Sequence, residues 1–307
     1  MINYYFRTVK DDHLKEVEQF RTGVWIHAVE PSEDELTELF HDLQLDENLV
    51  EDARDFFEVP RLERSDGATY FFTRYPYAGT NEDVDTAPLL IVMGESFVLT
   101  VALREVPQFQ KFLDGREVVH TTQKTKLFIQ FMQAVTTSYE RQLTRLRKAV
   151  HRDRTKLRRI SSREIVQFVN YEHQLNDMVS ALVPTNTWLQ QVTKGNYIQL
   201  YREDVELMED LMIDNSQLVD SARSVLKTIQ NVRTASEAIL ANKLNMTIRT
   251  LTVITVLLTL PMVVSSFYGM NVGLPLSEHP FAFWFIVLFV GFWVALAAWL
   301  FKRYEWF

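Results

Sequence analysis

The chain contains no cysteine. This absence excludes disulfides, thiolate metal sites and cysteine nucleophiles, and it suits a reducing compartment. The sequence also has no Walker-type phosphate loop and no nucleophile elbow, and its seven histidines show no ligand spacing. An enzyme is therefore the least favoured functional class, and ATP hydrolysis is not expected as a source of energy.

Charged residues are missing from two long stretches, 250–277 and 280–301. Each stretch exceeds the roughly 20 apolar residues that a helix needs to cross a hydrocarbon core of about 30 Å. A buried helix of a large soluble protein is the alternative, but two such runs back to back favour a transmembrane pair. The residues near Met1 are not a long apolar run, so no cleavable secretion signal is expected.

Basic residues lie before the first stretch and after the second, but not in the connector between them. Lys243 and Arg249 precede the first, Lys302 and Arg303 follow the second, and the connector 271–280 has no Lys or Arg. The positive-inside rule then places both termini in the cytoplasm. We expect a multi-pass protein of the cell (inner or plasma) membrane.

Charge is distributed unevenly along the rest of the chain. Residues 1–248 carry 29 basic and 38 acidic side chains, which argues against general nucleic-acid binding. Glu30–Glu58 holds twelve acids and one Arg, and is either a solvated helical face or a surface sensitive to divalent cations. Arg141–Arg163 holds ten basic residues opposed only by Asp153. That run is a solvated helix, a partner for acidic segments of its own or a neighbouring chain, or a nucleic-acid or lipid site of a membrane-anchored sensor.

Strand and helix signals alternate over residues 1–124, which predicts an α+β cytoplasmic domain. Short β-type runs lie at Ala68–Thr73, Leu89–Val92 and Ser96–Ala102. Ser32 and Glu35 have the spacing of a capping box at the start of a helix.

Beyond residue 124 the strand signals stop. Two helices, Thr125–Ser161 and Ser162–Gln191, are predicted to form a hairpin over 125–196. No Gly or Pro lies between Gly195 and Pro261, so one helix of some 60 residues, about 90 Å long, can run into the membrane. A helix of that length needs partners, which a symmetric oligomer supplies. The predicted segments are a stalk helix (197–249), a first span (250–270), an outer connector (271–280), a second span (281–301) and a basic cytoplasmic tail (302–307).

Small and hydroxyl-bearing residues recur along one face of the first span. Asn245, Thr252, Thr259 and Ser266 repeat every seven residues, and Ile248, Thr255, Met262 and Gly269 form a second series. The stripe either lets two helices approach closely or faces a central axis, where hydroxyls would contact the water shell of an ion. No charged residue lies in either span, so a proton relay through buried charge is not indicated.

The first span ends in Tyr268-Gly269-Met270-Asn271. A Gly-Met-Asn triplet is common, but at the outer end of the first of two C-terminal spans it resembles the signature of the CorA family of magnesium transporters. Trp25-Ile26-His27-Ala28 with Pro31 is similar to the family's Trp-Ile-Asp-Leu…Pro segment, although His27 and Ala28 depart from it.

The resemblance implies a funnel-shaped homopentamer of this α+β domain, long helices and two transmembrane helices. Tyr268, Gly269, Met270 and Asn271 would form the outer selectivity motif, with Asn271 contacting the ion through its hydration shell. The implied pore-lining residues are Asn245, Ile248, Leu251, Thr252, Thr255, Thr259, Met262 and Ser266. Glu278 is expected to attract cations at the outer mouth, and Asp210 falls on a regulatory metal position whose usual second acid is Thr234 here.

The expected function is influx of Mg²⁺ driven by the membrane potential, with Co²⁺ and Ni²⁺ as further candidate ions. Cytoplasmic Mg²⁺ is expected to gate the channel by feedback. No permanently bound cofactor is expected, and the partners are the bilayer, divalent cations and further copies of the chain, not nucleic acid. The alternative is the related zinc-transport branch, coupled to protons; Met270 favours magnesium.

Overall fold

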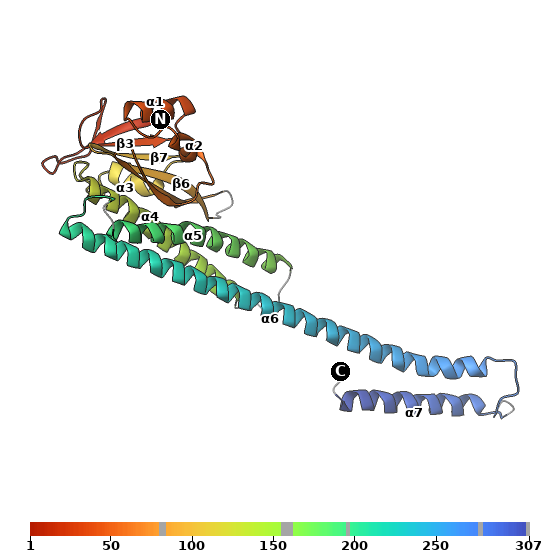
Figure 1. Ribbon diagram of the computed structural model, residues 1–307. Helices are drawn as coiled ribbons and strands as arrows, with labels where there is room; N and C mark the ends of the chain where they lie inside the picture. The colour runs from red at the N-terminus through yellow and green to blue at the C-terminus, as the bar shows by residue number, and fades with distance from the viewer. Residues whose placement is uncertain (80–83, 155–161, 195–196, 276–278, 305–307) are drawn as a thin grey trace. The chain divides into compact units, whose positions relative to one another are not determined.

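The computed structural model describes residues 1–79, 84–154, 162–194, 197–275 and 279–304 (Figure 1). The chain divides into two units, Met1–Asn231 and Val232–Phe307. One helix, α6, belongs to both.

A seven-stranded sheet forms the centre of the first unit, in the order β2-β1-β3-β7-β6-β5-β4. Neighbouring strands are antiparallel except β3 and β7, which pair in parallel from Val24↔Phe97 to Val29↔Ala102. The strands are β1 (Ile2–Phe6), β2 (Lys15–Val17), β3 (Val24–Val29), β4 (Arg61–Ser65), β5 (Ala68–Ala78), β6 (Val84–Met93) and β7 (Phe97–Ala102). The predicted α+β class is confirmed.

Alternation along β3 shows how the sheet receives helices on both faces. Val24, Ile26 and Ala28 point into a core with α1 (Glu33–Asp42) and α2 (Leu49–Arg54). The intervening Trp25 and His27 point to the opposite face. Since successive side chains of a strand alternate, a strand buried on both faces is almost continuously apolar, as β3 is.

The second face of the sheet is covered by η2 (Pro107–Phe109), α3 (Gln110–Leu113), α4 (Lys124–Arg154) and α5 (Ser162–Lys194). Aromatic rings make this contact: Trp25 lies 4.8 Å from Phe131, and Phe71 lies 4.3 Å from Phe128. Thus α1 and α2 lie on one side of the sheet and α4 and α5 on the other (Figure 1).

The capping box predicted at the start of α1 is present. Ser32 Oγ accepts the Glu35 N–H at 3.1 Å, and Glu35 Oε2 accepts the Ser32 N–H at 2.9 Å. This reciprocal pair satisfies two of the backbone donors that a helix start leaves unpaired.

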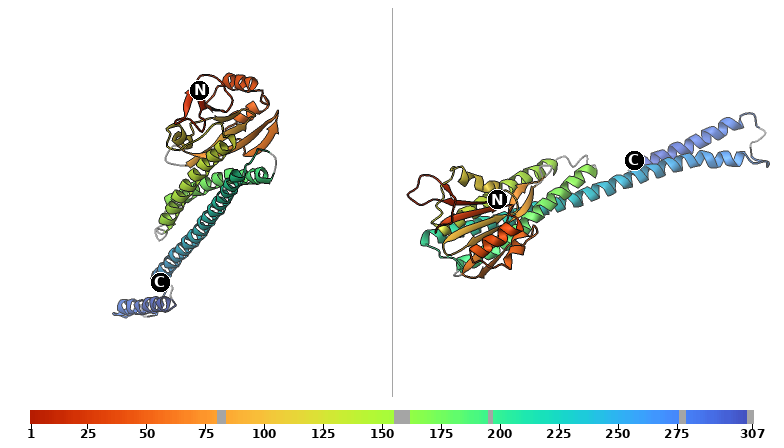
Figure 2. Two further views of the ribbon diagram at one scale, coloured as in Figure 1. Left: turned by 90° about the vertical axis from the view of Figure 1, so that its left-hand side faces the viewer. Right: turned by 90° about the horizontal axis from the view of Figure 1, so that it is seen from above.

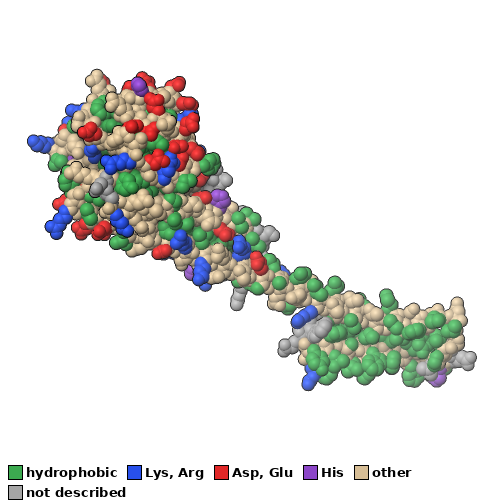
Figure 3. All heavy atoms as spheres, in the orientation of Figure 1, with side chains coloured by type: hydrophobic (Ala, Val, Ile, Leu, Met, Phe, Trp, Pro, Cys, Tyr) green, Lys and Arg blue, Asp and Glu red, His purple; other side chains and the backbone are tan. Residues whose placement is uncertain are grey.

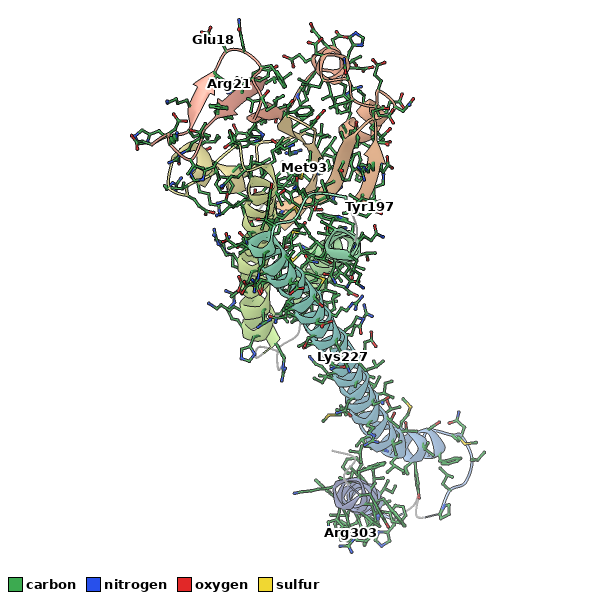
Figure 4. All side chains as sticks on the ribbon, turned by 60° about the vertical axis from the view of Figure 1, so that its left-hand side comes forward. Glu18, Arg21, Met93, Tyr197, Lys227 and Arg303 are labelled. Carbon is green, nitrogen blue, oxygen red and sulfur yellow. The ribbon has the colours of Figure 1, made fainter. Side chains whose placement is uncertain are left out.

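Long helices make up the rest of the chain. The helix predicted over Thr125–Ser161 is α4, which ends at Arg154; residues 155–161 are outside the described ranges. The last long helix of the first unit is α6 (Arg202–Tyr268). Just before it, the chain is held to the sheet, because the Tyr197 carbonyl accepts a hydrogen bond from the Thr69 hydroxyl at 2.9 Å. Figure 4 shows Tyr197 near Met93. The helix continues through Pro261.

The second unit contains the last part of α6 and α7 (Ala282–Arg303), which lie side by side (Figures 1 and 2). In the described chain these are two helices long and apolar enough to cross a membrane. Hydrophobic side chains cover the visible face of both (Figure 3).

Candidate functional site

Backbone hydrogen bonds hold the Tyr268–Asn271 motif at the end of α6. The Gly269 N–H donates to Ser265 O at 3.0 Å, and the Met270 N–H donates to Phe267 O at 3.2 Å. A Cβ on Gly269 would lie 3.4 Å from Ser265 O, which is ordinary van der Waals contact, so the turn of a single chain does not require glycine here. The Tyr268 hydroxyl donates to Pro275 O at 3.2 Å, which ties the following connector back to the helix.

Asn271 follows directly and is exposed. Within the described ranges its carboxamide makes no hydrogen bond to another group of the chain. A carboxamide offers an acceptor oxygen and two N–H donors without net charge. The side chain is therefore free to bond a solvent or ion-bound water beyond the end of α6.

The face of α6 toward α7 is separate from the predicted polar stripe. Val253, Leu257, Leu260 and Val264 are buried or half-buried and recur every three or four residues. Val264 and Phe267 line an apolar cavity of about 690 Å³ with Phe285, Ile286 and Phe289 of α7. At 100° per residue, Thr255, Met262 and Ser266 lie on the other side of the helix. The side of α6 that carries the stripe is thus left open in one chain.

All eight residues predicted to line a pore are exposed on α6: Asn245, Ile248, Leu251, Thr252, Thr255, Thr259, Met262 and Ser266. Side chains that contact lipid, and side chains that face an axis between subunits, would both be exposed in a single chain. Their role as a pore lining stays a prediction.

The threonine hydroxyls on the stripe have fixed orientations. Thr252 Oγ1 donates to Ile248 O at 2.9 Å, Thr255 Oγ1 to Leu251 O at 2.8 Å and Thr259 Oγ1 to Thr255 O at 2.7 Å. Because each hydroxyl has one hydrogen and that hydrogen is bonded along the helix, the oxygen presents only lone pairs outward. Water bound to a cation can donate to such an oxygen, whereas an anion finds no donor there.

Asp210 lies on α6 in the first unit, with Asp214 and Gln217 on the same helical face. Asp210 is exposed. Asp214 and Gln217 line a polar cavity of about 260 Å³ between α4 and α6, together with Glu140 and Arg147. Over the described part of one chain, no three His, Asp or Glu residues are grouped so as to hold a metal ion. The regulatory role of Asp210 stays a prediction.

The predicted outer acid, Glu278, lies outside the described residues.

Comparison with known proteins decides the family. Residues 21–303 match the family of CorA-like Mg²⁺ transporter proteins. The chain belongs to the CorA family. The cobalt/magnesium transport protein CorA of Methanocaldococcus jannaschii is 24% identical over 294 residues, covering 92% of this chain and 91% of that one.

Solved structures share the fold. The complete CorA magnesium transporter of M. jannaschii superposes with a TM-score of 0.89 at 19% identity, covering 100% of this chain and 99% of that chain. Full-length CmaX gives a TM-score of 0.78 at 16% identity over 100% and 98% of the two chains. The cytoplasmic domain of Vibrio parahaemolyticus ZntB gives 0.64 at 8% identity over 78% and 98%.

Family membership makes this CorA-like chain a divalent-cation transporter of the membrane and not an enzyme. The family transports Mg²⁺.

One departure from the family pattern, His27, occupies the middle of the sheet. The residue is buried and packs against the rings of Trp25 and Phe109. Thr100 Oγ1 lies 2.8 Å from His27 Nδ1 and accepts the Trp25 Nε1–H at 2.9 Å. Burial lowers the pKa of His27 to about 4, so the ring is neutral at pH 7. Its position makes it part of the core of the first unit.

Sequence reasoning missed two features of this CorA-like site. The inward face Val253–Leu257–Leu260–Val264 has a helical repeat that was readable beside the polar stripe. The direction of the threonine hydroxyls had no signal, because it depends on side-chain rotamers.

Proposed function

We propose that the chain assembles as a homopentameric channel of the cell membrane, with both termini cytoplasmic, that admits Mg²⁺ down the membrane potential. Co²⁺ and Ni²⁺ are proposed as further permeant ions. Support comes from family membership, the two candidate spans and the Gly-Met-Asn turn at the end of the first.

The observation that carries the proposal is the free Asn271 carboxamide just beyond α6. Mg²⁺ gives up its octahedral water shell reluctantly. A ring of Asn271 oxygens can accept hydrogen bonds from those waters without removing them. A ring of carboxylates would hold the ion more tightly and slow its exit.

Below the motif, the stripe of α6 continues the proposed path. Thr255 and Thr259 present acceptors to the ion's water shell, as their bonded hydroxyl hydrogens require. Ile248 and Leu251 supply an apolar constriction that can close by excluding water. Five copies of Glu278 would attract cations at the outer end.

The membrane potential is sufficient as a driving force. One elementary charge crossing 100 mV is worth about 2.3 kcal/mol, so a divalent ion gains about 4.6 kcal/mol. No energy-coupling motif is needed for accumulation.

We also propose that cytoplasmic Mg²⁺ inhibits conduction by binding between Asp210 of one subunit and an acid of Glu30–Glu58 on its neighbour. The absence of a three-ligand cluster in the described part of a single chain fits a site shared between subunits. Thr234 stands where the resemblance implies a second acid, with Glu237 one turn away, and Asp210 is the ligand that we propose α6 supplies.

The alternative function is proton-coupled zinc transport. The likeness to the ZntB cytoplasmic domain extends to the fold alone, so it does not distinguish the two functions. Met270 in the middle of the motif favours magnesium.

Flux into proteoliposomes containing a magnesium-sensitive dye tests the proposal. An imposed inside-negative potential should drive Mg²⁺ entry into vesicles with the native protein. Asn271→Ala should reduce entry at least tenfold, while the neighbouring Val272→Ala should retain it.

Zinc with an imposed pH gradient is measured in parallel. If Mg²⁺ does not enter while Zn²⁺ moves with the pH gradient, the protein belongs to the zinc branch and the channel proposal is wrong.

A further inference from the structure

Two exposed stripes of opposite charge lie on the helices of the cytoplasmic unit. The acidic stripe is Asp34, Glu38 and Asp42 of α1. The basic stripe is Arg141, Arg145 and Lys148 of α4. Residues three and four apart share a helical face, so each stripe is a single row of side chains.

Neither stripe is neutralised within the chain. The ion pairs of α1 and α2 use other acids, as in Glu33–Arg54 and Asp52–Arg61. Across the residues that the structure describes, the acidic stripe has no ion pair. The basic stripe has none either, and Arg145 only donates weakly to Gln142 at 3.4 Å.

The sheet separates the two stripes. α1 packs on the face formed by Ile26, Leu99 and their neighbours, whereas α4 packs on the opposite face through Phe128 and Phe131. Figure 3 shows acidic side chains gathered over the end of the unit that carries α1 and α2. The stripes therefore cannot meet inside one chain, and any contact between them joins two molecules.

The two rows also match in length. Asp34 to Asp42 spans eight residues of helix, about 12 Å, and Arg141 to Lys148 spans seven, about 10 Å. Laid along one another, three acids face three bases.

We propose that the acidic stripe of one subunit lies against the basic stripe of the next. The contact joins different surfaces of identical chains, which is the heterologous arrangement that closes into rings. It rests on the homopentamer of the proposed function and adds the cytoplasmic surfaces that set the order and register of its subunits. Exposed charge pairs act mainly on specificity and association rate, so this interface orients subunits that the membrane helices also hold.

The natural absence of cysteine allows a direct test in the full-length protein. Glu38→Cys combined with Arg145→Cys should form disulfides between subunits on mild oxidation, giving a ladder of covalent oligomers that ends at the closed ring. Matched controls are each single variant and the pair Glu38→Cys with Gln190→Cys, which places the second thiol on α5. The controls should remain mostly monomeric on denaturing gels.

Charge reversal in the same background separates electrostatic pairing from chance proximity. Adding Asp34→Lys, or Lys148→Glu, should slow formation of the 38–145 disulfide at least threefold. Reversing both stripes together, Asp34→Lys and Asp42→Lys with Arg141→Glu and Lys148→Glu, should restore the rate whichever way the two helices run. Raised salt should slow the unreversed pair.

The outcomes distinguish the inference from the function on which it rests. If chemical fixation shows the oligomer but Glu38→Cys/Arg145→Cys gives no disulfide, the stripes do not meet and the inference is wrong. If fixation shows no oligomer, the homopentamer itself fails, and the interface with it. If vesicles of phosphatidylserine bind the native protein but not Arg145→Glu, and the disulfide does not form, the basic stripe binds anionic lipid and the inference is wrong.

Discussion

At the scale of single residues, the threonines of α6 show how an apolar span can carry polar function. Their hydrogens bond to carbonyls four residues back, so the hydroxyls add no unpaired donor to the membrane. What remains exposed is a row of acceptors.

Thr259→Val keeps the shape of this side chain and removes its oxygen. If the stripe lines the path, magnesium flux should fall about five- to tenfold, which corresponds to a total loss of about 1 to 1.4 kcal/mol in hydrogen bonding to the ion's water shell. Thr259→Ser should retain most of the flux. Thr250→Val is the matched control, because Thr250 makes the same bond, to Met246 O at 2.9 Å, on another face. Equal losses in both valine variants would contradict a role for the stripe.

His27 makes the stability of the first unit depend on pH. Its pKa is about 4 when folded and about 6.5 when unfolded, so between these values the unfolded chain holds a proton that the folded domain lacks. Stability should therefore be lost as pH falls from 6.5 to 4, by at most about 3 kcal/mol, and this contribution should be constant above pH 7.

Urea unfolding of residues 1–231 at several pH values measures the slope. His27→Gln should flatten it in this range, whereas the exposed His173→Gln should leave it unchanged. A slope that survives His27→Gln would assign the effect to other groups.

At the scale of elements, α6 is the helix that contributes residues to both structural units. Its 67 residues begin in the domain that contains Asp210 and end at the Gly269 turn. A continuous helix has few ways to absorb a change at one end, because each turn is bonded to the next. Binding near Asp210 can therefore bias the helix as a body.

Asp210→Ala tests this link. Flux into vesicles should become insensitive to internal Mg²⁺ over a range where the native protein is inhibited, with uninhibited flux changed less than twofold. Asp220→Ala removes an exposed acid from the same helix and should leave inhibition intact. Unchanged inhibition in Asp210→Ala would remove this residue from the regulatory site.

At the scale of the whole molecule, the sequence predicted what depends on local pattern. The β-run Ala68–Thr73 lies within β5, the run Ser96–Ala102 is β7 with Ser96 added, the capping box at Ser32 forms, and most of each charge-free stretch lies in α6 or α7. These features need only neighbouring residues to be recognised.

Long-range features were not predictable. The parallel pairing of Val24–Val29 with Phe97–Ala102 joins segments about 70 residues apart, and local alternation gives no partner for either. The opposite placement of the acidic α1 and basic α4 depends on that topology. Asn271 was recognised by resemblance, whereas its freedom from internal hydrogen bonds needed coordinates.

Membrane orientation is a property of the whole chain and can be read with introduced cysteines. In intact cells Val272→Cys should react with a membrane-impermeant maleimide, because the connector is expected outside. Lys302→Cys should react only after permeabilisation. The native chain, which has no cysteine, provides a background without labelling. Labelling of Lys302→Cys in intact cells would reverse the proposed topology.

The parallel strand pair has a consequence for biosynthesis. β3 emerges early from the ribosome but cannot form its parallel pairing until β7 has been synthesised. The hydrogen bond from the Thr69 hydroxyl to the Tyr197 carbonyl forms later still, because Tyr197 follows β7 in the chain. The first unit is complete at Asn231, 19 residues before the uncharged stretch begins at Thr250. At 5–20 residues per second that interval is about 1 to 4 s. The domain thus has its whole sequence available before insertion begins, and its own folding competes with the arrival of the first span at the membrane.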